Sequence, residues 1–245
     1  MKYGFLVKLL LTSIISAALL LTLSVAFGEL DPHQSIDGEN APVNADDPKY
    51  KTVIIDAGHG GEDGGASSEA GLVEKDVNLE IAVILREMLE ANGVDVVMTR
   101  EDDRLLYDRN VNYQGRKKKL DLAARVAIAD STPDAIFISI HMNSFSDPRY
   151  SGLQVWYSQN NADSYSLAEL IRSKNQGMLQ SDNSRKTKAA TSAINLLHNA
   201  KCPAVLVECG FLSNADEAAL FETHSYRQKV AFMLFCSVTE FLETN

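Results

Sequence analysis

Cysteine is scarce in this chain of 245 residues, which has three: Cys202, Cys209 and Cys236. Three is too few, and odd in number, for the disulfide framework of a small secreted domain. Cys202 and Cys209 flank an apolar run, and if that run is a strand their sulfurs lie about 20 Å apart, far beyond the ~7 Å limit for bridging. We therefore expect free thiols that pack as small hydrophobes, with a catalytic thiol as the alternative.

The chain also lacks Lys/Arg-rich blocks long enough to follow a phosphate backbone. Its 23 basic and 33 acidic side chains give a net charge of −10, so nucleic acid is not an expected partner. A multi-pass membrane protein is excluded too, because a long apolar run occurs only at the N-terminus. Hydrophobic residues make up 45% and charged residues 23%, which excludes wholesale disorder and predicts a globular domain.

The first 28 residues have the pattern of an export signal. Residues 9–28 carry no charge, and Lys2 and Lys8 precede that stretch. Small residues at Ser24 and Ala26 offer a cleavage site, but the run is also about long enough to cross a bilayer, so a removed signal peptide and a retained membrane anchor both stay open. We expect an extracytoplasmic protein, either secreted or anchored on the outer face of the membrane through this segment alone.

Residues 29–50 are acidic, contain three prolines and have almost no large apolar side chain. This composition is typical of a flexible linker. Residues 51–245 remain, and they are enough for one substantial catalytic domain with its own core.

Within 51–245, short apolar runs alternate with segments whose apolar residues recur at helical spacing. The predicted strands are 51–56, 94–99, 135–141, 152–157 and 203–208. The predicted helices are 77–89, 116–130, 164–179 and 226–242. This alternation predicts a single α/β domain with a mixed, mostly parallel sheet and helices on both faces.

Three of the predicted strands end near a side chain suited to metal or acid–base chemistry: His59, His141 and Glu208. The carboxyl ends of strands in an α/β sheet line the crevice where ligands bind, so these residues can converge there. Glu74, at the start of the first long helix, is a plausible fourth member. Two imidazoles and one carboxylate leave a tetrahedral zinc with an open position, which is the pattern of a catalytic site.

Such a site suits hydrolysis of an amide bond. Zinc would lower the pKa of its water and polarise a carbonyl oxygen, while Glu208 would act as general base and acid. Spacing alone does not decide the question, because this is not the compact His-Glu-x-x-His helix. The alternative is that the histidines satisfy backbone groups of their own loops.

Other polar residues are weaker candidates. His33 lies in the linker, and His198 and His224 are expected at the surface. Asp56 could orient a ligand or cap its turn, and Asn143 could bind substrate or fix its loop. Five arginines could meet a substrate carboxylate but are each expected in surface ion pairs: Arg100, Arg109, Arg116, Arg125 and Arg185.

Five sequence blocks carry a resemblance to a known family. They are IIDAGHGGEDGGA at 54–66, EKD at 74–76, MTRE at 98–101, SIHMN at 139–143 and PAVLVECGFLSN at 203–214. In order and spacing they cover almost all of the predicted domain, which resembles the zinc-dependent N-acetylmuramoyl-L-alanine amidases of the amidase-3 family. The resemblance implies a phosphorylase/hydrolase-like fold, one Zn²⁺ ion held by His59, Glu74 and His141, and Glu208 as the catalytic carboxylate. The bond cut would be the amide between N-acetylmuramic acid and L-Ala of peptidoglycan stem peptides.

Within the family, the sequence most resembles the germination-specific amidases of spore-forming bacteria. The features that match are the leader, the short acidic spacer, the lone catalytic domain and the run RKKK at 116–119, followed by Asp121 and Arg125. The resemblance implies peptide removal in the spore cortex that lets muramic-δ-lactam form, in the intermembrane space of the developing spore. An accessory protein partner is left open, because some relatives need one.

Three alternatives stay open. The first is a general wall-remodelling or cell-separation amidase. The second is a catalytically dead peptidoglycan-binding module, against which the retention of all four candidate residues argues. The third is a zinc peptidase or carboxypeptidase that acts on the stem peptide itself.

Overall fold

The computed structural model describes residues 48–108, 110 and 115–245. The predicted leader, residues 29–47 of the predicted linker, His33 and Arg109 lie outside the described residues. In chain order the elements are β1 (Thr52–Ala57), α2 (Glu74–Ala91), β2 (Asp95–Met98), α3 (Lys117–Ser131), β3 (Ala135–Asn143), β4 (Gln154–Tyr157), α4 (Asp163–Met178), β5 (Lys188–Ala189), α5 (Asn195–Asn199), β6 (Ala204–Phe211), α6 (Ala215–Phe221) and α7 (His224–Thr244).

The strands form one mixed sheet in the order β2-β1-β3-β6-β4-β5. β2, β1, β3 and β6 run parallel, whereas β4 is antiparallel to β6. β4 reverses direction because only the loop 144–153 separates it from β3, and a parallel crossover needs a dozen or more residues. The mostly parallel sheet expected from the sequence is confirmed.

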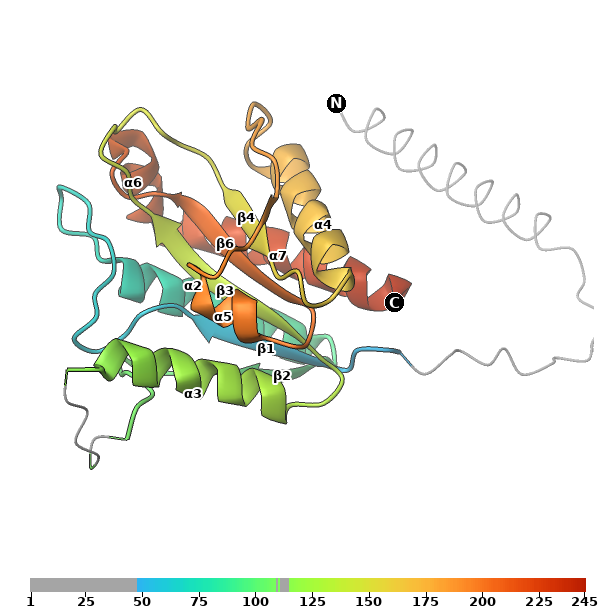
Figure 1. The fold of residues 1–245 in the computed structure, drawn as a ribbon. Helices are drawn as coiled ribbons and strands as arrows, with labels where there is room; N and C mark the ends of the chain where they lie inside the picture. The colour runs from blue at the N-terminus through green and yellow to red at the C-terminus, as the bar shows by residue number, and fades with distance from the viewer. Residues whose placement is uncertain (1–47, 109, 111–114) are drawn as a thin grey trace, which may run out of the picture. The chain divides into compact units, whose positions relative to one another are not determined.

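Helices cover both faces of the sheet, as predicted (Figure 1). One core cluster joins α2, α4 and α7 to side chains such as Ile136 and Ile138 of β3. The other joins α3 and α5 to the opposite face, where Phe137 of β3 packs. Because successive strand residues point to opposite faces, a strand covered on both sides must be apolar throughout, which is the pattern of β3.

Tyr50, near the start of the described residues, packs against the C-terminal part of the chain. The ring of Tyr50 stacks on Phe241 near the C-terminus, with 5.8 Å between centroids, and its hydroxyl donates to Asp163. These contacts place the entry of the chain at the end of the sheet where β1 starts. None of the described helices is long and apolar enough to cross a membrane.

The cysteines behave as predicted. All three are free thiols, and Cys209 is buried in the cluster under α2, α4 and α7. Its neighbour Glu208 therefore faces the other side of the sheet, toward α3 and α5.

Candidate metal centre

The structure brings three of the predicted site residues together at the carboxyl end of the sheet. His59 lies in the loop after β1, Glu74 is the first residue of α2, and His141 lies near the end of β3. One side-chain ligand atom from each lies within 4.8 Å of the others. Glu74 Oε1 is 3.2 Å from His59 Nε2 and 3.0 Å from His141 Nδ1. A tetrahedral zinc ion with bonds of about 2.0–2.1 Å sets its ligand atoms about 3.3 Å apart, so the group fits such an ion.

Glu74 is held as a charged carboxylate. It is 3% exposed, and its two oxygens accept hydrogen bonds from the backbone amides of Met142 (3.0 Å) and Ala66 (2.7 Å). Burial alone would raise the pKa of Glu74, but hydrogen bonds and charge interactions with His141 and His59 outweigh burial and hold it well below the ordinary value. The carboxylate is therefore ionised and fixed in place, as a metal ligand must be.

Two glycines make room for the His141 and Glu74 side chains. A Cβ atom on Gly58 would lie 2.3 Å from the imidazole of His141, and one on Gly65 would lie 2.4 Å from the carboxylate of Glu74. Gly65 also has a positive φ of 70°, a conformation that favours glycine. The Gly-rich stretch after β1 thus admits the His141 and Glu74 side chains against its backbone.

Two buried arginines hold the loop that carries His59, so the expectation of surface ion pairs is wrong for both. Arg125 is 2% exposed and donates to the carbonyls of Ala57 (2.9 Å) and His59 (2.8 Å). Arg100 is 1% exposed and donates to the carbonyls of Ala57 (2.9 Å) and Gly58 (3.0 Å). Three consecutive carbonyls are satisfied in this way, and His59 is held at a positive φ of 62°.

The carboxylate of Asp56 holds Arg125 in place. This buried carboxylate accepts hydrogen bonds from Arg125 Nη1 (2.5 Å), Ser139 Oγ (2.6 Å) and Thr99 Oγ1 (2.7 Å). Burial alone would raise the pKa of Asp56, but Arg125 and the two hydroxyls lower it below the ordinary value. Asp56 therefore acts on the site through Arg125.

Asp63 is a site residue that the sequence reasoning missed. Its Oδ2 lies 3.0 Å from His59 Nδ1, at ion-pair distance, although the buried ring nitrogen makes no well-aligned hydrogen bond. The carboxylate is in position to orient the ring whose other nitrogen faces Glu74. The only signal in the sequence was an acidic residue four positions after His59.

Glu208 lies on β6, paired in register with His141 of β3. Its Oε2 is buried and has no hydrogen-bond partner within the described residues. Burial, reinforced by the nearby charge of Glu74, raises the pKa of Glu208 above the ordinary value. A buried carboxylate oxygen without a donor, beside two imidazoles and a second carboxylate, fits a site that holds a metal ion and water.

A cleft of about 190 Å³ opens beside these residues. His59 and His141 line it together with Asp63, Leu122 of α3, and Ile194 just before α5. The histidines are therefore reachable from solvent between α3 and the chain that leads into α5.

The other two histidines of the described residues, His198 and His224, lie at the surface, as predicted. His198 is exposed on α5, and His224 pairs with Glu80 at 2.6 Å while 63% of its side chain is exposed. Asn143 fixes its own loop, because its side-chain oxygen accepts from the amide of Ser144 at 2.8 Å.

Comparison with known proteins agrees with this geometry. The family model for N-acetylmuramoyl-L-alanine amidase matches residues 53–239. The chain is 36% identical over 191 residues to the germination-specific N-acetylmuramoyl-L-alanine amidase of Bacillus subtilis (strain 168). This match covers 78% of this chain and 79% of that protein.

Two solved structures are also similar. The CwlD amidase from Clostridioides difficile, in complex with the GerS lipoprotein, is 37% identical with a TM-score of 0.76, covering 80% of this chain and 100% of that one. The N-acetylmuramoyl-L-alanine amidase AmiC2 of Nostoc punctiforme is 32% identical with a TM-score of 0.65, covering 79% of this chain and 97% of that one.

The fold and the His/Glu group define a hydrolase with a candidate metal site at the carboxyl end of a mixed sheet. The chain belongs to the N-acetylmuramoyl-L-alanine amidase family, whose members act on peptidoglycan of the cell wall.

Proposed function

We propose that this protein is a zinc-dependent amidase that cuts the bond between N-acetylmuramic acid and L-Ala of the stem peptide. The observation that carries the proposal is the convergence of His59, Glu74 and His141 beside the unpartnered carboxylate of Glu208. Bound there, zinc would polarise the scissile carbonyl and make a water molecule more acidic.

The residues of the chain divide the remaining work. His59, Glu74 and His141 hold the ion, and Asp63 orients the His59 ring. Glu208 takes a proton from the attacking water and passes it to the leaving nitrogen. Its raised pKa suits this role, because a more basic carboxylate takes the proton from water more readily and keeps it until it is passed to the leaving nitrogen.

We further propose a role in maturation of the spore cortex, in which removal of stem peptides lets muramic-δ-lactam form. The similarity to the germination-specific amidase of Bacillus subtilis supports this role. The protein would work outside the cytoplasm, in the intermembrane space of the developing spore. An accessory lipoprotein is the partner that the complex of the Clostridioides difficile amidase suggests.

Mass spectrometry of products tests the activity. The full chain, loaded with zinc and incubated with purified muropeptides, should release peptides with L-Ala at a free N-terminus and leave peptide-free glycan. A stem-peptide carboxypeptidase or peptidase would instead shorten the peptide while L-Ala stays on the sugar. A binding module would leave the muropeptides intact.

Cortex analysis of a strain without this protein tests the spore role. We expect muramic-δ-lactam to disappear from the cortex muropeptides of that strain. Unchanged lactam, together with amidase activity of the purified protein, would indicate a general wall-remodelling or cell-separation amidase.

A further inference from the structure

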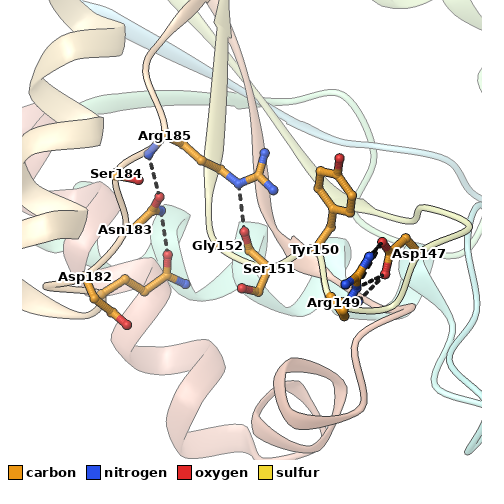
Figure 2. A pocket seen from close by; sticks show the side chains of 10 residues that line it. Asp147, Arg149, Tyr150, Ser151, Gly152, Asp182, Asn183, Ser184 and Arg185 are labelled. Carbon is orange, nitrogen blue, oxygen red and sulfur yellow. Dashed lines mark hydrogen bonds and ion pairs between the residues drawn. The ribbon is translucent and has the colours of Figure 1, made fainter.

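A second groove lies beyond the candidate metal centre, between the loop that leads into β4 and the loop that follows α4. It encloses about 520 Å³, and its walls are residues 147–152 on one side and 180–185 on the other. Figure 2 shows Arg185 extending across this groove toward Tyr150.

The guanidinium of Arg185 is held in position without a salt bridge to any described residue, although it interacts with the charge of Glu217. Its Nε donates to the carbonyl of Ser151 at 2.7 Å, and its central carbon lies 4.8 Å from the centroid of the Phe211 ring and 5.8 Å from that of Tyr150. In the described part of the chain, no carboxylate lies within ion-pair distance of it. The nearby Glu217 already accepts from the backbone amides of Phe211 (2.8 Å) and Gly152 (3.0 Å).

Arg149, which lines the same groove, has a carboxylate partner where Arg185 has none among the described residues. Its guanidinium makes three contacts with the carboxylate of Asp147, at 2.6, 2.9 and 3.1 Å, and 88% of its side chain is exposed. Arg149 is therefore neutralised on the surface, whereas the half-buried Arg185 is held on aromatic rings with its two terminal nitrogens turned to the groove (Figure 2).

The register of the sheet places this groove next to Glu208. Gln154 of β4 pairs with Glu208 of β6, so their Cα atoms are about 5 Å apart. Ser151, which holds Arg185, precedes Gln154 by three residues, or about 10 Å of extended chain. The side chain of Gln154 also donates to the carbonyl of Lys186, which keeps the Arg185 segment beside the strand. The groove is thus two to three residues of extended peptide away from Glu208.

We propose that Arg185 binds a carboxylate of the stem peptide, on the residue that directly follows the L-Ala whose amide is cut. This inference rests on the proposed function. Peptides of the cell wall carry free carboxylates beyond L-Ala, whereas the lactyl carboxyl of the sugar is consumed in the amide bond and the glycan otherwise offers hydroxyl and acetamide groups. A planar guanidinium fixed on aromatic faces matches a carboxylate through two parallel N–H···O bonds.

The test compares two synthetic muropeptides that differ only at the residue after L-Ala, one with a free carboxylate and one with a carboxamide. The wild-type full chain should favour the carboxylate by about 10- to 100-fold in kcat/KM, mostly through KM, which is the range of a charge-assisted pair. Arg185→Gln should lose this preference, so that kcat/KM becomes similar for the two substrates. Arg185→Lys should keep part of the preference, because lysine keeps the positive charge but cannot make two parallel hydrogen bonds to a carboxylate.

Arg172→Gln is the matched control, because Arg172 is also half-buried but pairs with Glu169 on α4. It should retain the full preference. Thermal unfolding of each variant shows whether loss of the Ser151 contact alone alters the fold. The wild-type comparison needs no variant, and equal kcat/KM for the two substrates would overturn the inference.

Failure of the proposed function is distinguishable from failure of this inference. If the wild type cleaves neither substrate, the proposed activity is wrong, and calorimetry with the two free peptides then decides the role of Arg185. Tighter binding of the carboxylate peptide, lost in Arg185→Gln, supports the assignment. Equal affinities contradict it.

Discussion

At the scale of single residues, Glu208 differs from the other site carboxylates in having a buried oxygen without a partner. We predict that Glu208→Gln lowers kcat by at least about 100-fold, because the amide cannot carry a proton between water and the leaving nitrogen. Zinc content and unfolding temperature should stay close to those of the wild type, since Glu208 is not among the proposed ligands. Near-normal turnover of muropeptides by this variant would remove Glu208 from its proposed role.

Gly58 offers a test of the proposed metal site that leaves every proposed ligand unchanged. A methyl group at this position would overlap the His141 ring, so Gly58→Ala should displace the ring and weaken zinc binding, by about 10-fold or more. Gly177→Ala is the control, because its added Cβ would meet no atom within 4 Å beyond the adjoining residues and backbone of its own helix. Zinc affinity can be measured by competition with a chelator, and equal affinities in the two variants would contradict the ligand assignment.

The residues that converge on the site could be predicted from the sequence because each follows, ends or starts an element. His59, His141 and Glu208 come at the carboxyl ends of apolar strands, where an α/β fold gathers them. Arg100 and Arg125 could not be predicted as buried, because their partners are loop carbonyls that only the folded backbone presents together. Charge alone favoured the surface for both.

At the scale of elements, the Asp56–Arg125 pair ties α3 to the end of β1, and its contribution should depend on pH. The pKa of Asp56 lies below about 3.9, the value in an unfolded chain, so the pair stabilises the fold above that pH. This stabilisation is lost as the pH falls through the folded-state pKa.

Asp56→Asn should therefore cost about 1.5–3 kcal/mol of unfolding free energy at pH 7, because the buried Arg125 loses a charge-assisted hydrogen bond and keeps only Asp121 as its counter-charge. Urea unfolding between pH 7 and pH 3 should show that the difference in unfolding free energy between wild type and variant becomes smaller as the pH falls. A difference that is independent of pH would show that the ionised carboxylate is not what stabilises the loop.

The longer elements were predictable and the short ones were not. All nine predicted strands and helices are present with shifts of a few residues at their ends, since each has enough residues to show a period. Three short elements were not predicted: the two-residue β5, the five-residue α5 and the seven-residue α6. They contain too few residues for their apolar side chains to show a period. Of these, α5 and the residues before it matter for function, because they form one wall of the cleft.

At the scale of the whole molecule, metal binding should add to the stability of the fold. A ligand that binds only the native state stabilises it by mass action, which for tightly bound zinc is about 4 kcal/mol or more and corresponds to a rise in unfolding temperature on the order of 10 °C. Removal of the metal with a chelator should lower the unfolding temperature and abolish amidase activity, and zinc should restore both. Full activity in protein shown to be metal-free would overturn the zinc proposal.

The anchoring of Tyr50 bears on how the enzyme reaches a polymer. Tyr50 is fixed against Phe241 at the end of the sheet where β1 begins, and the six residues of β1 lead about 20 Å to the loop that carries His59. Chain attached ahead of Pro48 thus joins the domain at the end opposite the cleft. A polymeric substrate that reaches the cleft therefore approaches the domain at the end of the sheet away from Tyr50.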